Sequence, residues 1–166
     1  MNAPVHPTYT NEITPQALSR LDVSPFTEAQ LAEFGEQARA VIQQQREYVQ
    51  AHPPLAIYRF ATEGSQTRDG GVIQQATSLL AFTLDCGRKV RAAQKGDAVL
   101  YADGSTARIV TTAGQANSHL ALVGSRLSNG DEIINTLQGI GLFVARQGVP
   151  MAEDFLPRIK GVEINE

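Results

Sequence analysis

A pattern of short strands and turns recurs between Gly70 and Pro150, and it restricts the possible folds of this chain more than any other feature. β-branched pairs begin the pattern three times, at Val72-Ile73, Ile109-Val110 and Ile133-Ile134. Each run spans about four to six residues and ends at Gly, Asn or Asp, as short strands joined by tight turns do. Because repetition takes priority over local propensity, the sequence predicts a mainly β repeat domain.

Ordered short motifs accompany this pattern over roughly Tyr58 to Pro157. They are Ala61–Ser65, Gly70–Ile73, Val90–Ala93 with Gly96-Asp97, Ala102–Ser105 with Ile109–Thr111, and Ala121–Ser125 with Asn129–Ile134. In this order they resemble a PAAR-repeat domain, the tip piece of type VI secretion and related contractile machines. The resemblance implies a three-repeat β-hairpin cone or prism. With the N-terminal α-helical extension described below, the expected fold class is α+β.

The same resemblance implies a tip protein without enzymatic activity, which caps and sharpens a trimeric spike protein of the VgrG type. A chain with three repeats can offer near-equivalent strand edges to a threefold partner, by main-chain hydrogen bonding. The residues expected at the docking rim are Val72, Ile109, Val110, Ile133 and Ile134, or their neighbours.

PAAR domains usually bind a structural zinc through three histidines and a cysteine, and this chain departs from that pattern. A histidine commonly precedes Gly-Gly-Val in the family, whereas Arg68 and Asp69 stand here. Within the β domain only Cys86 and His119 remain as candidates, with Asp103 as a third oxygen ligand. A closed zinc site needs four ligands, so no cofactor is expected.

Cys86 and His119 also raise the alternative of a small hydrolase, because a thiolate nucleophile needs a histidine within hydrogen-bond reach. The competing interpretation is that Cys86 packs at a turn and His119 begins a strand. Asp97 and Asp131 each follow a glycine, and they are interpreted as turn residues that accept hydrogen bonds from nearby backbone N–H groups.

Helices are predicted before the β domain. Thr14-Pro15 is a typical helix start, and this first helix should end before Pro25. Thr27 and Gln30 form a capping-box pattern, which predicts one helix of about 25 residues ending at His52-Pro53. Its partner face is expected to hold Leu31, Phe34, Ala38, Val41, Ile42 and Tyr48.

Three roles for this helix stay open from sequence. It can pack on the chain's own β domain, associate with a second copy as a coiled coil, or dock an effector, adaptor or chaperone. In the last case the chain is an effector-adaptor binding module, which is the main alternative to the tip function.

The expected domains are a helical extension over 1–54, a PAAR-like tip over 55–157 and a tail over 158–166, with a terminal strand at Val162–Ile164. The net charge is −3 and basic residues are spread thinly, which argues against nucleic-acid binding. No secretory signal, membrane-spanning segment or stable membrane anchor is expected from the sequence. It is therefore expected to stay in the cytoplasm until a secretion machine exports it.

Overall fold

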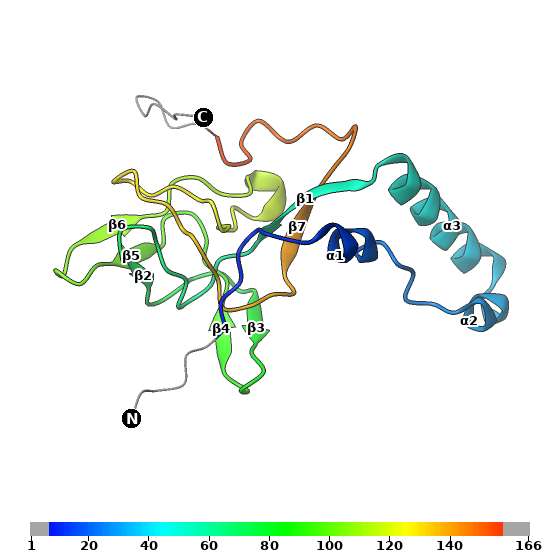
Figure 1. Ribbon diagram of the computed structural model, residues 1–166, viewed down its shortest axis with the longest axis horizontal. Coiled ribbons are helices and arrows are strands. Elements are labelled where there is room, and N and C mark those ends of the chain that lie inside the picture. The colour runs from blue at the N-terminus through cyan, green and yellow to red at the C-terminus, as the bar shows by residue number, and fades with distance from the viewer. Residues whose placement is uncertain (1–6, 158–166) are drawn as a thin grey trace. The chain divides into compact units, whose positions relative to one another are not determined.

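The computed structural model describes residues 7–157 of the chain, and it is a mixed α+β structure with N-terminal helices and several small antiparallel sheets (Figure 1). The chain divides into two compact units. The β unit comprises Tyr58–Phe143 and the described parts of Met1–Glu12 and Met151–Glu166. The helical unit comprises Ile13–Ile57 and Val144–Pro150. The coarse α+β prediction is therefore confirmed.

Three helices lie in the helical unit: α1 (Pro15–Arg20), α2 (Glu28–Glu33) and α3 (Glu36–Ala51). The predicted start signals are confirmed. The Thr14 side chain accepts a hydrogen bond from the backbone N–H of Ala17, and Thr27 and Gln30 form both hydrogen bonds of a capping box. As predicted, α3 ends before the prolines, with His52 at its C-cap.

The prediction of one continuous helix from Thr27 to His52 is wrong, because the chain breaks at Phe34-Gly35. Phe34 has an extended backbone (φ −77°, ψ 148°), and Gly35 is the N-cap of α3. Glycine is a poor residue for a helix interior, and the Phe34 ring packs edge-on against Phe26 with centroids 5.1 Å apart. Leu31 and Phe34 therefore do not continue the face of α3.

Within residues 7–157, seven short strands and one 3-10 turn follow. They are β1 (Pro54–Arg59), β2 (Val72–Ile73), β3 (Ala81–Thr83), β4 (Lys89–Arg91), β5 (Ala98–Leu100), β6 (Thr106–Arg108), η1 (Gln115–Asn117) and β7 (Leu142–Arg146). Among the described residues the sheets contain two or three strands each, in the orders β1-β7, β2-β5-β6 and β3-β4.

Three segments of the β unit share one pattern of backbone hydrogen bonds. Each begins with a β-turn, at Thr62–Ser65, Gln94–Asp97 and Leu122–Ser125, in which the last N–H donates to the first carbonyl. The third residue of every turn is a glycine with φ between 88° and 106°, a conformation that side-chain-bearing residues rarely adopt. We call these the first, second and third turns.

A hairpin follows each turn and returns to it. The three hairpins are Ser65–Ile73, Asp97–Ile109 and Ser125–Ile133, and in each the final isoleucine carbonyl accepts a hydrogen bond from the turn glycine. Their tips are Thr67–Gly71, Tyr101–Ser105 and Leu127–Asp131. Isolated bridges or ladder pairs then connect each hairpin to another: Ile73 with Val99, Ile109 with Leu127, and Ile133 with Thr67.

Three alanines connect the segments at the entrance to the turns. Ala61 N–H donates to Ala121 C=O at 2.9 Å, Ala121 N–H donates to Ala93 C=O at 2.8 Å, and Ala93 N–H donates to Ala61 C=O at 2.9 Å. All three residues are fully buried. The three hydrogen bonds therefore form a ring, the alanine ring, which leaves no space at its centre for a larger side chain.

The core below the alanine ring consists of small and branched side chains. It contains Ile73, Ala76, Val99, Ala107, Ile109, Leu127 and Ile133, together with the three ring alanines. The isoleucines therefore hold the hairpins together by apolar burial. Ile109 and Ile133 were expected at an exposed rim, but each is only 1% exposed, so they belong to the core.

The described part of the N-terminal arm is anchored. Tyr9 pairs with Thr136 through two backbone hydrogen bonds, and the Asn11 amide donates to the Val123 carbonyl and accepts from the Arg59 N–H. These contacts hold Tyr9 and Asn11 of the arm against the β unit. The expected strand at Val162–Ile164 lies outside the described residues. No helix within residues 7–157 is long and apolar enough to cross a membrane.

Candidate functional site

The repeated hydrogen-bond pattern gives the β unit two distinct ends. Because equivalent residues of the three hairpins pair with one another in the same sense, the three tips point the same way. We call the tips the hairpin end, and the first, second and third turns with the residues beside them the turn end. The candidate site is the pair of ends, since each presents three related loops.

Tyr101 covers the hairpin end. The second hairpin is longer than the other two, so its tip reaches beyond them (Figure 1). The Tyr101 phenol donates to Oδ2 of Asp131 at 2.5 Å and accepts from the Asn129 amide at 3.0 Å. A Cβ placed on Gly71 would lie 2.9 Å from the Tyr101 ring, so the ring rests directly on the first hairpin. One side chain thus connects all three hairpins.

Asp131 is the polar centre of this end, and it is only 2% exposed. Burial alone would raise its pKa, but hydrogen bonds from Thr67, Tyr101 and the N–H groups of Glu132 and Asp69 outweigh burial and lower the pKa. Burial raises the pKa of Tyr101, and its hydrogen bond to Asp131 adds to that shift. The pair is therefore held as a neutral phenol and a carboxylate.

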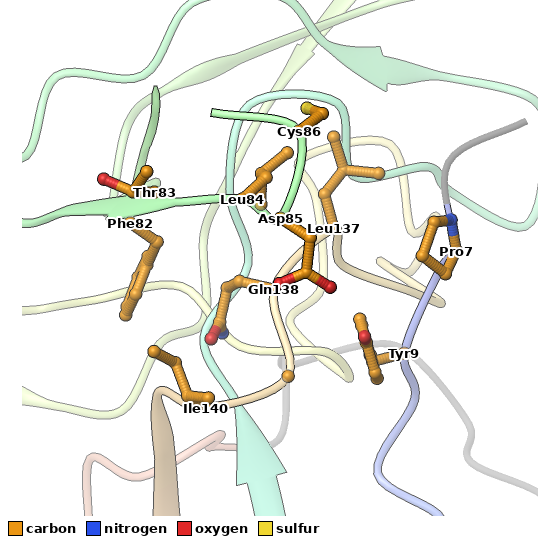
Figure 2. A pocket seen from close by; sticks show the side chains of 11 residues that line it. Pro7, Tyr9, Phe82, Thr83, Leu84, Asp85, Cys86, Leu137, Gln138 and Ile140 are labelled. Carbon is orange, nitrogen blue, oxygen red and sulfur yellow. The ribbon is translucent and has the colours of Figure 1, made fainter. Parts of the chain in front are cut away.

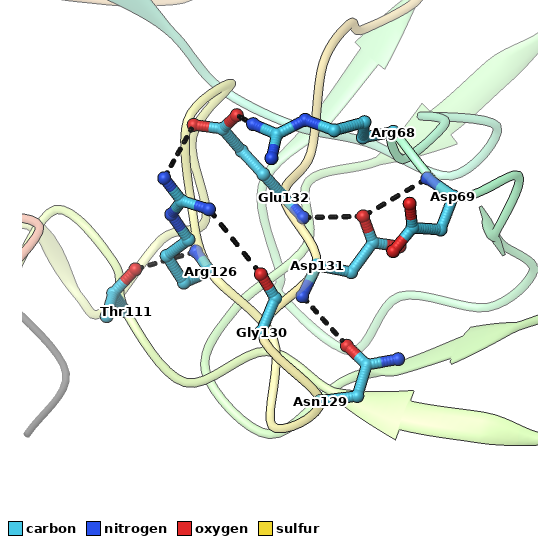
Figure 3. Close-up of polar contacts among 8 residues, drawn as sticks. All are labelled: Arg68, Asp69, Thr111, Arg126, Asn129, Gly130, Asp131 and Glu132. Atoms are coloured by element: carbon cyan, nitrogen blue, oxygen red, sulfur yellow. Dashed lines mark hydrogen bonds and ion pairs between the residues drawn. The ribbon is translucent and has the colours of Figure 1, made fainter. Parts of the chain in front are cut away.

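Side chains reinforce the contact between the first and third hairpins. Figure 3 shows Glu132 between Arg68 and Arg126; it pairs with both, and the Arg126–Glu132 distance is 3.8 Å. Beside them, Asn135 accepts from the Gln66 N–H and donates to the Gln66 side chain, both at 2.9 Å. This is the contact that joins the ends of the repeated region.

The turn end is covered unequally. A Cβ on Gly64 would collide with Leu137, and Gly124 has Leu156 and Asn11 beside it. A Cβ on Gly96 of the second turn would meet nothing within 4 Å. The second turn is therefore the open one.

The predicted docking residues divide into two groups. Val110 and Ile134, which follow the core isoleucines toward the turn end, are 37% and 41% exposed. Val72 is half-buried, and Ile109 and Ile133 are buried. Only the first two can offer large apolar side chains to a partner.

The predicted partner face of the helices is also divided. Ala38, Val41 and Tyr48 are exposed on α3, Ile42 is half-buried, and Leu31 of α2 is buried. No residue of α3 is buried. Within the helical unit a groove of about 370 Å³ runs between residues 21–26 and α3. The apolar face of α3 thus remains accessible.

The two candidate ligand or catalytic residues are not part of a metal cluster. Across residues 7–157, no group of three or more His, Cys, Asp and Glu side chains is placed to hold a metal ion, Asp103 included. Cys86 and His119 are both exposed. Asp97 accepts from the Gln94 and Thr77 N–H groups, and Asp131 from those of Glu132 and Asp69, so their interpretation as turn residues is confirmed.

A shallow groove of about 550 Å³ lies beside the β3–β4 hairpin (Figure 2). Its lining side chains come from three parts of the chain: Pro7 and Tyr9, residues 82–86, and residues 137–140. Most of them are apolar, and Asp85 and Cys86 contribute a carboxylate and a thiol to the lining. No acid, base and nucleophile converge there in an arrangement typical of an enzyme.

Sequence reasoning missed Tyr101, Asn135 and Asn11, and it placed the ring alanines in short motifs without predicting that they bond to one another. A signal for the ring was present, because Ala-x-x-Gly followed by Ser or Asp occurs at 61–65, 93–97 and 121–125. Tyr101 had no comparable signal, since its role depends on the extra length of one hairpin.

Comparisons with models of protein families, with curated proteins and with solved structures gave no match for this chain.

Proposed function

We propose that the three turn-hairpin segments form a three-repeat β prism. The support is the cyclic order of their contacts: the first segment pairs with the second, the second with the third, and the third with the first. The ring of alanine hydrogen bonds repeats that order at a second level along the same axis.

On this prism we propose the function of a tip protein that caps a trimeric, VgrG-type spike of a contractile secretion system and has no catalytic role. The alanine ring carries the proposal. A single chain with three equivalent segments can meet three chains of a partner at once, and open strand edges at the end of a trimeric β structure need such a cover. The PAAR-like motifs support the same function.

The turn end is the docking end in this proposal, and the hairpin end points away. Val110 and Ile134 supply exposed apolar side chains beside the turn end, as an interface core requires. The hairpin tips expose polar and charged residues instead, including Arg68, Asp69 and Asp103. Hydrogen bonding around Tyr101 and Asp131 closes that end in this proposal.

The helical unit is proposed to dock an effector, adaptor or chaperone. The observation that favours this role is the exposed apolar face of α3, with Val41 65% and Tyr48 43% exposed. An amphipathic helix that offers such a face is a common means of partner recognition. The chain would be made in the cytoplasm and leave the cell with the spike.

The proposed docking end is tested with exposed residues, because substitution of Ile109 or Ile133 would unfold the core. A Val110→Asp/Ile134→Asp variant should lose binding to the cognate spike trimer in size-exclusion chromatography. Leu100→Asp is the matched control, since Leu100 is 39% exposed and lies nearer the hairpin tips. Equal binding by both variants would remove the turn end as the docking surface.

A further inference from the structure

The two ends of the β unit carry opposite charge. The hairpin tips carry Asp69, Asp103 and Asp131 with Arg68. The first and second turns, with the residues bonded to them, carry Arg91, Lys95 and Arg108 with Glu63 and Asp97. A partner that meets the turn end therefore meets a positive surface.

The acids of the turn end, Asp97 and Glu63, already accept hydrogen bonds from other residues of the chain. Asp97 is 5% exposed, and its carboxylate accepts from the N–H groups of Thr77 and Gln94 and from the Thr77 hydroxyl. The Glu63 carboxylate accepts from the N–H groups of Arg91 and Ala76. Neither acid forms an ion pair with a cation of the turn end within the described residues.

Exposed cations gather around the second turn. Arg108 donates from Nη1 to the Gly96 carbonyl at 3.1 Å, which brings its guanidinium to the turn. The Lys95 N–H donates to the His119 carbonyl at 2.9 Å, so the third segment's entrance lies beside it. Lys95, Arg108 and His119 are all exposed, and none of them takes part in a salt bridge within residues 7–157.

The backbone at this place is unusual as well. Ser118 and His119 are consecutive non-glycine residues with φ of 56° and 53°. Such conformations are rare for side-chain-bearing residues and are often found at functional positions. They present His119 next to the open turn. By contrast, chain segments cover the first and third turns at Gly64 and Gly124.

We propose that the second turn, with Lys95 and Arg108, binds an acidic segment of the spike partner and so fixes which of the three turns makes the charged contact. This inference rests on the proposed tip function and adds the chemistry of the partner to it. A threefold partner offers the same acidic segment three times, and the chain engages one copy at its open turn. Charges at an exposed interface mainly raise the association rate and select the orientation.

The test compares charge variants of the full chain by surface plasmon resonance on immobilised spike trimer, at about 50 and 300 mM salt. Lys95→Glu/Arg108→Glu should lower the affinity at least about tenfold at low salt, mostly through the association rate, and should flatten the salt dependence. The affinity of the neutral variant Lys95→Gln/Arg108→Gln should lie between the affinities of the Lys95→Glu/Arg108→Glu variant and the native chain. A hexaglutamate peptide should slow association of the native chain only.

Arg88→Glu/Lys89→Glu is the control, because both residues are exposed cations outside the second turn. Equal loss in this control would overturn the inference in favour of a general charge effect. The inference would also be wrong if Lys95→Glu/Arg108→Glu bound the trimer like the native chain while Val110→Asp/Ile134→Asp lost binding. In that case the proposed tip function would be supported without the charged contact. If the native chain did not bind the trimer, both the charged contact and the proposed tip function would be wrong.

Discussion

The phenol oxygen of Tyr101 lies 2.5 Å from Oδ2 of Asp131, and this hydrogen bond joins the longest hairpin to the third one across the hairpin end. Asp131 is 2% exposed and receives further hydrogen bonds from Thr67 and from backbone N–H groups. In the proposed prism, this network closes the hairpin end.

Tyr101→Phe should therefore destabilise the protein without a change of shape. A hydrogen bond to a charged group contributes about 1.5–3 kcal/mol, which corresponds to a fall in melting temperature of about 3–12 °C for a chain of this size. Thermal unfolding followed by circular dichroism measures it, with chelator present and absent. Tyr58→Phe is the control, since no hydrogen bond of its hydroxyl is found in the described residues. Equal effects of the two would refute the closing role of Tyr101.

The same pair predicts loss of stability at both extremes of pH. The pKa of Asp131 is lowered on folding, so its contribution is present above the ordinary aspartate value of about 3.9 and is lost as the pH falls through the folded-state pKa. The pKa of Tyr101 is raised, so its contribution is lost as the pH rises above about 10. Urea unfolding between about pH 2 and 11 should show both losses, and Tyr101→Phe should lack the alkaline one.

The alanine ring predicts intolerance to added volume. Ala93→Val places two methyl groups against Ala61 and Ala121, whose backbones are fixed by the ring hydrogen bonds. Overpacking of this kind costs about 1–3 kcal/mol. Ala102→Val, at an exposed position on a hairpin tip, should cost less than about 0.5 kcal/mol. Chemical denaturation of both variants tests the ring, and a tolerant Ala93 would mean that the three segments are not tightly packed.

Gly71→Ala should disturb the hairpin end. The added Cβ would lie 2.5 Å from Cγ1 of Val99 and 2.9 Å from the Tyr101 ring. Either the ring must move from Asp131 or the first two hairpins must separate, at a cost of about 1–3 kcal/mol. Gly35→Ala is the matched control, because its Cβ would meet no atom within 4 Å. Chemical denaturation of both variants measures this cost, and a Gly71→Ala variant as stable as the native chain would contradict the close contact.

The helical unit depends on one bidentate ion pair. Arg146 donates to both Asp22 oxygens, at 2.6 and 2.9 Å, and both side chains are 16% exposed. The hydrogen bonds to Asp22 raise the pKa of Arg146. Asp22→Ala should leave Arg146 without its partner and loosen the residues before α2, at a cost of about 2–3 kcal/mol. Hydrogen exchange should rise in α1 and α3 but not in the alanine ring; an even rise across the chain would contradict this.

Local signals predicted local structure well in this chain. Thr14-Pro15, Thr27 with Gln30 and His52-Pro53 each mark a helix boundary, because caps and prolines act within one turn of the backbone. The break at Phe34-Gly35 was missed since a spacing of three and four residues continues across it. The spacing of apolar residues gives no sign that Phe34 has an extended backbone.

The proposed prism agrees with the predicted repeat but not with its starting points. The sequence copies begin at Val72-Ile73, Ile109-Val110 and Ile133-Ile134, and these pairs contain the core isoleucines at the end of each hairpin. The unit in space instead begins at Ala61, Ala93 and Ala121, and short alanine motifs attract less attention than β-branched runs. Alternation places Ile109 and Val110 on opposite faces, but it does not say which face is buried; in the structure Ile109 is buried and Val110 is exposed.

The most direct test of the account is the mass of the complex between the purified full chain and its cognate spike trimer, measured by light scattering after size-exclusion chromatography. A cap with three internal segments should give one chain for each trimer, and the complex should persist with Tyr101→Phe and disappear with Val110→Asp/Ile134→Asp. Three chains for each trimer, or no complex at any ratio, would contradict the proposed function.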